Sequence, residues 1–313
     1  MAPVVELAGG VGGAKLAEGL AAHLASDLTV IVNTGDDLEV HGLAIWPDHD
    51  TVAYTLAGLD DEVRGWGQRD ETWVVMDRLA ELGDEPWFRL GDRDLATHVW
   101  RTDRLRDGAR PTDVALALRE RLGFAPRVLP MTDAPVRTEV RTDDGWLEFQ
   151  EYFVHRHQAP EVHEVRFRGV EAAAATPEVR AALAGAAVIV VAPSNPLVSV
   201  GPVLAVPGMA DAIHAARDRG VPVIAVSGIV GGKALKGPAD RMLASLGHES
   251  SALGVARLYQ DLVDIFVLDT IDAELAPAIE ALGLRTVVTD TIMGDDAGRA
   301  RFAGEVLAAA APS

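Results

Sequence analysis

The sequence predicts an α/β protein built on a doubly wound, mostly parallel, Rossmann-like sheet. Short runs of valine and isoleucine alternate with helical patterns along the whole chain of 313 residues. Unbroken apolar runs of this length are typical of parallel strands buried on both faces. The first run also leads directly into a glycine-rich loop and a helical pattern, which is how nucleotide-binding sheets of this class begin.

The predicted elements follow in a regular order. A strand is expected over residues 4–7, a helix from the glycines to about Leu24, and a second strand over residues 28–33. Helical spacing continues in residues 51–59, 71–82 and 111–123, with Thr112 as a predicted N-cap and Gly123 as a helix stop. Further strands are predicted over residues 187–192, 221–228, 264–269 and 285–290.

One interval departs from this rhythm. Residues 127–169 alternate polar and apolar residues around an Asp-Asp-Gly turn, which predicts a small antiparallel hairpin inserted within a single α/β domain, residues 1–313. Three histidines lie beside it, at positions 155, 157 and 163. They fit a solvated loop better than a metal site, because no carboxylate–histidine pattern accompanies them.

Composition limits the partners and the compartment. A net charge of −19 and an isoelectric point near 4.8 disfavour binding to nucleic acid. No apolar run reaches the roughly 18–20 residues that span a bilayer, and no basic segment precedes an apolar one at the N-terminus. Cysteine is absent, which excludes disulfides and thiolate metal sites. We therefore expect a cytoplasmic protein with small-molecule substrates and no membrane partner.

The glycine-rich stretch LAGGVGGAKL predicts a phosphate site. Glycines let the backbone approach an anion closely, and the helix that follows directs its free N–H groups at that anion. The spacing is not that of a dinucleotide fingerprint, which needs a third glycine where Lys15 lies, nor that of a P-loop, because Leu16 replaces the hydroxyl residue. We predict that Gly10, Gly12, Gly13 and Lys15 bind a nucleotide phosphate.

Lysine is rare and occurs only in glycine-rich segments. Lys15 lies in the first of them, and Lys233 and Lys236 lie in GGKALKGP. Contact with a phosphate would explain why all three lysines lie in glycine-rich segments. The alternative is that they lie there by chance. The sequence assigns no specific role to the last two lysines.

Aspartates follow the second predicted strand. Asp36 and Asp37 are adjacent, and Asp48 and Asp50 come shortly afterwards in PDHDT. Carboxylate oxygens are preferred ligands of a hard cation such as Mg²⁺, and a metal ion beside a phosphate site is typical of phosphoryl chemistry. Asp50 could in addition cap the helix that follows it.

Two later loops carry polar side chains. RLGDRDLATH supplies Arg89 and Asp92, and forms either a substrate loop or a surface ladder of ion pairs. APSNPLVSVGP offers Ser194 and Asn195 between prolines, where small polar groups could contact a phosphate or a base.

Taken together, these motifs resemble the 2-phospho-L-lactate transferase family. The segments occur in the order expected of that family and cover essentially the whole chain: GGVGGAKL, VNTGDDLEVHGLAIWPDHDTVAYTLAG, LGDRDLATH, LPMTDAPVRT, APSNPLVSVGPVLAVPGM and ALGVARLYQDLVDIFVLD. The resemblance implies a magnesium-dependent enzyme of coenzyme F-420 biosynthesis. Such an enzyme transfers a phospho-three-carbon acid from a guanosine diphosphate conjugate to the ribityl hydroxyl of 7,8-didemethyl-8-hydroxy-5-deazariboflavin and releases GMP.

The resemblance also implies roles for individual residues. Deazaflavin binding falls to Asp50, Arg89, Asp92 and Met131, metal binding to Asp37, Asp50 and Asp36, and nucleotide binding to the glycine-loop residues with Asn33, Ser194 and Asn195. Asp50 and Asp37 are the candidate catalytic residues, and Asp50 is a candidate acceptor for the hydroxyl proton. A homodimer is expected. The arginine- and alanine-rich composition is typical of actinobacteria, and the resemblance implies that actinobacterial members transfer phosphoenolpyruvate whereas archaeal members transfer 2-phospholactate. We therefore expect phosphoenolpyruvate, although no residue separates the two.

Two other functions share part of this pattern. A non-catalytic regulatory protein of the same superfamily, which would bind a nucleotide sugar or a dinucleotide, has a similar N-terminal loop but no use for Asp50 and Arg89. An NAD-dependent oxidoreductase would need the missing third glycine.

Overall fold

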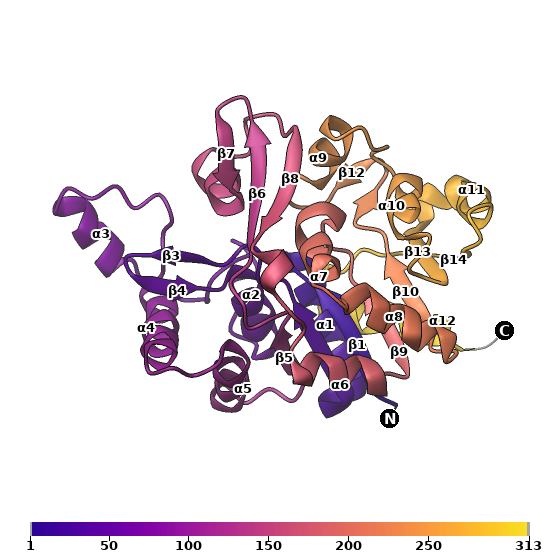
Figure 1. Ribbon diagram of the computed structural model, residues 1–313, viewed down its shortest axis with the longest axis horizontal. Coiled ribbons are helices and arrows are strands. Elements are labelled where there is room, and N and C mark those ends of the chain that lie inside the picture. Colours follow the sequence, from indigo (N-terminus) through magenta and orange to yellow (C-terminus); the bar gives the residue numbers. More distant parts are fainter. Residues whose placement is uncertain (1, 312–313) are drawn as a thin grey trace.

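The computed structural model describes residues 2–311 and contains a sheet of seven parallel strands (Figure 1). The strands lie in the order β14-β13-β10-β9-β1-β2-β5, so the direction of winding reverses between β1 and β9. They are β1 (Val4–Ala8), β2 (Leu28–Val32), β5 (Arg127–Pro130), β9 (Val188–Val191), β10 (Val223–Val226), β13 (Ile265–Asp269) and β14 (Arg285–Thr289). The predicted doubly wound α/β fold is therefore confirmed.

Helices cover both faces of this sheet. Successive side chains of a strand point to opposite faces, so Leu7 and Ala8 of β1 belong to two different hydrophobic clusters. One face packs against α1 (Gly10–Leu24), α2 (Pro47–Leu56) and α12 (Asp296–Ala309). The other packs against α6 (Pro177–Gly185), α8 (Met209–Asp218), α10 (Ala252–Tyr259) and α11 (Ala276–Glu280).

One charged side chain lies inside this core. Glu6, at the centre of β1, is fully buried, and neither carboxyl oxygen has a hydrogen-bond partner among residues 2–311. Burial raises the pKa of Glu6 well above its usual value. The carboxyl group is therefore held in its neutral form over a wide range of pH.

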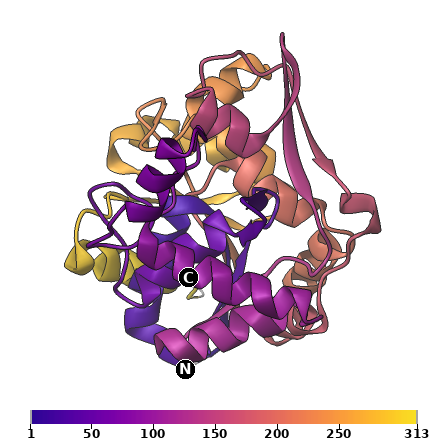
Figure 2. The ribbon, with the colours of Figure 1, turned by 90° about the vertical axis from the view of Figure 1, so that its left-hand side faces the viewer.

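A three-stranded antiparallel sheet projects from the body, as Figures 1 and 2 both show. It consists of β6 (Arg137–Thr142), β7 (Gly145–Glu148) and β8 (Glu164–Arg168), in the order β7-β6-β8. The predicted boundary at residue 127 is wrong, because Arg127–Pro130 pairs in parallel with β2 and is the edge strand of the main sheet. A π-helical turn, Glu151–His155, connects β7 to β8.

A second projection, at the left of Figure 1, is formed by the elements of residues 38–122 other than α2, which packs on the sheet. Its elements are β3 (Leu38–Val40), β4 (Leu43–Ile45), α3 (Val74–Glu81), α4 (Asp92–Arg106) and α5 (Pro111–Leu122). Helix α5 ends as predicted at Gly123, which is left-handed with φ +78°. The N-cap is Arg110, not Thr112, whose N–H and hydroxyl both donate to Asp133.

Short elements complete the fold beyond β9. They are the π-turn Pro196–Val200, α7 (Gly201–Ala205), β11 (Ile229–Val230), β12 (Lys233–Ala234) and α9 (Ala239–Ser245), together with 3₁₀ turns at Ala25–Asp27, Val170–Ala172 and Thr270–Leu275. In the described part of the chain, no single helix has the length and apolar character to cross a membrane. One helix pair with an 83° bend, Pro196–Ala205 and Met209–Asp218, meets those two criteria together.

Candidate active site

A cavity of about 620 Å³ opens at the carboxyl ends of β1 and β9. This is the point where the strand order reverses, and open α/β sheets bind their ligands there. One half of the cavity is lined by the glycine loop and by polar groups, and the other half is aromatic. The lining includes Gly9, Gly10, Gly12, Asp36, Asp48, Ser194, Asn195, Trp66, Trp87, Phe88, Arg89, Phe149 and Phe153.

The glycine loop is the first turn of α1, which begins at Gly10. Gly10 has φ +64°, a conformation that glycine adopts without strain. A Cβ atom on Gly12 would lie 2.4 Å from the carbonyl oxygen of Pro193, and one on Gly13 would lie 2.7 Å from Ala8 Cβ. Glycine is therefore needed for α1 to pack closely against the loop after β9 and against the end of β1. The N–H of Gly10 donates to Asp48, whereas those of Val11 and Gly12 have no acceptor within the helix and belong to residues that line the cavity, as an anion site requires.

The loop after β9 closes onto the glycines. The Ser194 hydroxyl donates to the Gly9 carbonyl oxygen at 2.7 Å and accepts from the Gly9 N–H at 3.3 Å. The Asn195 side chain accepts a hydrogen bond from the Leu197 N–H at 2.9 Å and so begins the π-turn that follows. Both predicted residues line the cavity, so the fold brings them together with the glycine loop.

Asp48 is the carboxylate that touches this loop. Its Oδ1 accepts from the Gly10 N–H at 2.7 Å, and its Oδ2 accepts from Asn33 Nδ2 at 2.9 Å. Asn33 is itself oriented by a 2.7 Å hydrogen bond from the Gly35 N–H to its Oδ1. Burial raises the pKa of Asp48 to about 6, although the hydrogen bonds from Asn33 and Gly10 act in the opposite direction. Asn33 therefore acts through Asp48 and does not line the cavity.

Asp36, which is buried, and Asp37, which is half-buried, complete this group of carboxylates. Burial raises the pKa of both well above the usual value, and the charge of Asp48 adds to the effect. One oxygen of each, Oδ1, is buried without a hydrogen-bond partner among residues 2–311. Unused carboxylate oxygens are ligands that a divalent cation such as Mg²⁺ prefers, but in the described chain the three residues whose ligand atoms lie within 4.8 Å of one another are Asp50, Asp94 and His98.

Asp50 lies on the other side of α2. The predicted N-cap role of Asp50 is wrong, because α2 begins at Pro47 and its N-cap is Trp46. Asp50 Oδ1 accepts a hydrogen bond from the fully buried Arg101 of α4. Burial is the largest single influence and favours a high pKa, but the charge of Arg101 and the contacts with His49 and His98 together lower the pKa of Asp50 below its usual value. Its Oδ2 is buried without a hydrogen bond in the described chain.

Two contacts of His98 extend the buried group around Asp50. His98 Nδ1 lies 3.7 Å from Asp50 Oδ2, and His98 Nε2 lies 3.2 Å from Asp94 Oδ1. Tyr54 donates to the same Asp94 oxygen at 2.6 Å. Asp50, Asp94 and His98 are close enough to share a cation, but Arg101 already supplies positive charge to Asp50. This group ties α2 to α4 beneath the cavity.

The aromatic half of the cavity is built by the two projections. Trp66, Trp87 and Phe88 come from the segment around α3, and Phe149 and Phe153 come from the turn after β7. Phe149 and Phe153 stack with ring centroids 5.6 Å apart, and 39% of Trp87 is exposed. Trp87 also stacks on His155 of that turn, with ring centroids 5.1 Å apart, so the two projections meet at this aromatic wall. Aromatic rings that line a cavity fit a planar ring system.

The remaining predicted residues are distributed differently. Arg89 lines the cavity and donates to Asp77 at 2.6 Å. Asp92 accepts from the N–H groups of Val74 and Val75 and thus caps α3. Met131 is fully buried in the core. Lys15 turns away from the glycine loop and donates to the Met293 carbonyl oxygen at 3.0 Å.

Sequence reasoning left some cavity residues without a role. The sequence motif PDHDT contains both Asp48 and Asp50 and does not distinguish their roles. A helix that begins at Pro47 would have distinguished them, because it directs the two side chains to different faces. The tryptophans at positions 66 and 87 lie in a stretch without periodicity, and nothing local marks them as cavity residues.

Comparison with known proteins gives a consistent result. The family described as "2-phospho-L-lactate transferase CofD" matches residues 4–300. A phosphoenolpyruvate transferase of Streptomyces avermitilis is 45% identical over 98% of each chain, and one of Kitasatospora aureofaciens is 42% identical over 98% of this chain and 97% of that protein. A 2-phospho-L-lactate transferase of Methanosarcina mazei is 39% identical over 93% of this chain and 94% of that protein.

A solved structure supports the fold. A protein of the UPF0052 family from Bacillus halodurans covers 98% of this chain and 100% of its own length, with a TM-score of 0.64 and 17% identity. At this identity the likeness concerns the fold alone. The names of the sequence relatives favour a transferase over the regulatory and oxidoreductase alternatives.

Proposed function

We propose that this chain, which belongs to the 2-phospho-L-lactate transferase family and is a transferase, moves a phosphoenolpyruvyl group between two small molecules. The donor is a guanosine diphosphate conjugate. The acceptor is the ribityl hydroxyl of 7,8-didemethyl-8-hydroxy-5-deazariboflavin, and GMP is released. The reaction belongs to coenzyme F-420 biosynthesis.

One observation supports this assignment more than any other. A single cavity joins the N-terminus of α1, which is suited to a diphosphate, to an aromatic wall suited to the deazaflavin ring, with Asp36 and Asp48 lining the space between them. A transfer between a nucleotide and a flavin-like acceptor needs both ends in one site, because the reacting atoms must meet.

The acceptor hydroxyl attacks the phosphorus atom nearer the three-carbon acid. A new oxygen–phosphorus bond forms, and the bond from that phosphorus to the oxygen that bridges to GMP breaks. The GMP oxygen carries the electron pair away, and N–H groups of the α1 first turn stabilise its charge. The hydroxyl proton passes to Asp48, whose pKa of about 6 suits a base near neutral pH. Asp50 is the poorer base, because Arg101 lowers its pKa.

Magnesium fits the carboxylates of this site. We propose Asp36 and Asp37 as ligands through their unpartnered oxygens, with Asp50 Oδ2 as a further predicted ligand. When bound, the ion would supply positive charge that neutralises the phosphates.

We propose phosphoenolpyruvate, and not 2-phospholactate, as the transferred group because of the names and sequence identities of the relatives. Several that are named phosphoenolpyruvate transferase are 42–45% identical to this chain, against 39% for the Methanosarcina relative. We also propose a homodimer, which sedimentation of the purified chain would test.

The experiment is a direct transfer assay. Purified protein, Mg²⁺ and the deazaflavin are mixed with the phosphoenolpyruvyl or the phospholactyl conjugate of guanosine diphosphate, and products are followed by mass. We expect GMP and phosphorylated deazaflavin in equal amounts, formed faster from the phosphoenolpyruvyl donor and abolished by a chelator. Absence of product from both donors would overturn the proposed function, and activity in the chelator would overturn the role of magnesium.

A further inference from the structure

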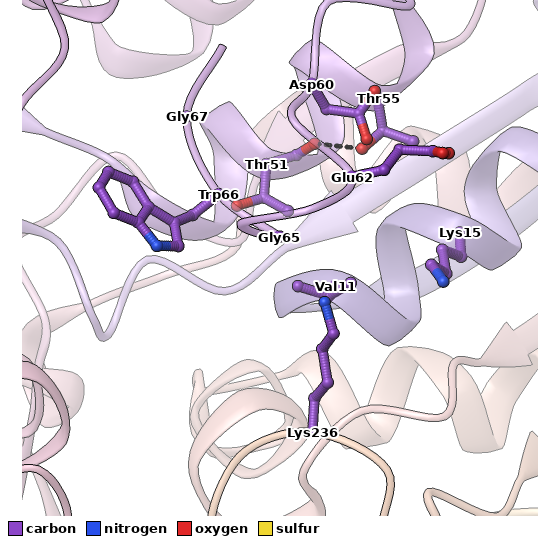
Figure 3. Close-up of a pocket in the computed structure, with 10 residues that line it drawn as sticks. All are labelled: Val11, Lys15, Thr51, Thr55, Asp60, Glu62, Gly65, Trp66, Gly67 and Lys236. Carbon is purple, nitrogen blue, oxygen red and sulfur yellow. Dashed lines mark hydrogen bonds between the residues drawn. The ribbon is translucent and has the colours of Figure 1, made fainter. Parts of the chain in front are cut away.

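The cavity contains a lysine that the proposed mechanism does not use. Lys236 follows β12, and its side chain lines the cavity together with Gly10, Val11 and Gly12. It also borders a smaller pocket with Val11 and Lys15 (Figure 3). Figure 3 shows the Lys236 side chain extended toward Val11, in the first turn of α1. The ammonium group therefore lies on the side of the cavity where the donor phosphates are expected.

Lys236 differs from the other two cations of the cavity wall. Arg64 lies 3.0 Å from Asp61, and Arg89 donates to Asp77 at 2.6 Å. Across residues 2–311, the Lys236 side chain has neither a hydrogen bond nor an ion pair. Two acidic residues, Asp60 and Glu62, line the smaller pocket with it, and Glu62 is already paired with Arg299. In a chain with a net charge of −19, an anionic ligand needs such a local positive charge to offset repulsion from the whole surface.

Lys15, the other lysine of Figure 3, is already engaged. Its Nζ donates to the Met293 carbonyl oxygen at 3.0 Å. Burial, followed by the charges of Arg299 and Lys236, lowers the pKa of Lys15. A lysine held in this way supports the packing of α1 against the segment before α12. Lys15 is therefore not placed to bind the phosphate as the sequence predicts, and another cation can take that role.

Gly65 leaves the space that the Lys236 ammonium group occupies. A Cβ atom on Gly65 would lie 2.4 Å from Lys236 Nζ. Gly67, two residues later, also has positive φ (+69°, against +77° for Gly65) but has open space around its Cβ position. The two glycines therefore form a matched pair, in which alanine has a similar backbone cost but only Gly65→Ala displaces Lys236.

We infer that Lys236 is the phosphate-binding lysine of this site: it neutralises the donor's diphosphate beside the N–H groups of the α1 first turn, and Gly65 leaves the space that its ammonium group occupies. The inference rests on the proposed function for the identity of the donor. An ammonium group with three donors and a row of backbone N–H groups are complementary contacts for a diphosphate, and charge-assisted hydrogen bonds of this kind are the stronger ones.

The test measures GDP affinity by calorimetry with Mg²⁺ present, in the wild-type chain and in five variants. We expect Lys236→Gln to weaken GDP binding about 10- to 100-fold and Lys236→Arg to recover most of that loss. Gly65→Ala should weaken binding and Gly67→Ala should not. Adding Gly65→Ala to Lys236→Gln should cause no further loss, because the displaced group is already gone. Thermal unfolding and deazaflavin affinity of each variant serve as checks on folding.

The outcomes separate this inference from the proposed function. If wild-type protein binds GDP and Lys236→Gln binds it equally well, the role of Lys236 is wrong while the function stands. If Gly65→Ala and Gly67→Ala weaken binding equally, backbone strain accounts for the effect and the placement by Gly65 is wrong. If the wild-type chain binds no GDP at all, both the inference and the proposed function fail.

Discussion

Asp48 and Asp50 show how two neighbouring carboxylates acquire different roles. Residues i and i+2 of a helix do not share a face, so Asp48 points to the glycine loop and Asp50 points to Arg101. The first is bound by two neutral donors and has a raised pKa, and the second is bound by a cation and has a lowered one. The proposed mechanism therefore assigns proton transfer to Asp48 and charge balance in the interior to Asp50.

Asp48→Asn tests this division. The amide keeps an acceptor for the Gly10 N–H but cannot take a proton, so kcat should fall about 10²- to 10⁴-fold while unfolding free energy changes by less than about 2 kcal/mol. Steady-state kinetics and thermal unfolding provide the two readouts. Asp107→Asn, at an exposed position after α4, is the control and should change neither. Retention of wild-type kcat in Asp48→Asn would remove Asp48 from the mechanism.

Glu6 makes a separate prediction about pH. Its pKa is raised in the folded chain, so the folded state binds a proton that the unfolded state releases above a pH of about 4.3. The free energy of unfolding should consequently fall as pH rises above that value, by up to about 1.4 kcal/mol per pH unit for this one group, until the folded-state pKa is reached. Glu6→Gln should remove that slope.

Urea unfolding between pH 5 and pH 8 measures the difference. We expect the variant to gain stability relative to wild type as pH rises. Parallel curves for the two proteins would contradict the neutral state assigned to Glu6.

At the scale of elements, the Asp50–Arg101 pair joins α2 to α4 and holds the projection of residues 38–122 against the body. Arg101 is fully buried and also lies over the Trp46 ring, at 4.3 Å from its centroid. Removing one partner of such a pair leaves an uncompensated buried charge. We therefore expect this ion pair to hold the projection in its position against the body of the protein.

Arg101→Met should lower the unfolding free energy by about 3–5 kcal/mol. Adding Asp50→Asn should recover part of that loss, because the unpaired charge is gone. Chemical denaturation of the single and double variants provides the measurement. If the double variant is no more stable than Arg101→Met, the unpaired charge of Asp50 is not the cause of the lost stability.

The two projections also supply the aromatic wall, and Trp87 tests its role. Trp87→Leu should raise KM for the deazaflavin about 10-fold, since a ring-stacking contact is lost, and should leave GDP affinity unchanged. Trp146→Leu, on β7 beneath Arg166 and outside the cavity lining, should alter neither. An equal loss of GDP affinity in Trp87→Leu would indicate that this wall does not bind the acceptor specifically.

On the scale of the whole molecule, local patterns predicted the sheet well. Valine-rich runs identified six of the seven parallel strands, because strands buried on both faces must be apolar. The edge strand Arg127–Pro130 was assigned to the hairpin, since its four residues show no pattern that distinguishes the two sheets. Sequence order also located the glycine loop and the Ser194 loop correctly beside each other, because both follow strands at the switch point.

The direction of individual side chains was not predictable in the same way. Met131 and Asp92 fall within motifs, yet one is in the core and the other caps a helix. Lys15 and Lys236 are alike in their glycine-rich surroundings, yet tertiary packing engages one and leaves the other facing the cavity. Motifs therefore located the site, and contacts between distant segments decided which residues take part in it.

The central claim is that one cavity holds the donor at the glycine loop and the acceptor at the aromatic wall. A crystal structure of the chain with GDP, Mg²⁺ and the deazaflavin tests this most directly. The account predicts density for the diphosphate at the N–H groups of the α1 first turn and for the deazaflavin ring between Trp87 and Phe153, with the ribityl hydroxyl directed toward the diphosphate. A deazaflavin bound outside this cavity, or a diphosphate bound away from α1, would contradict it.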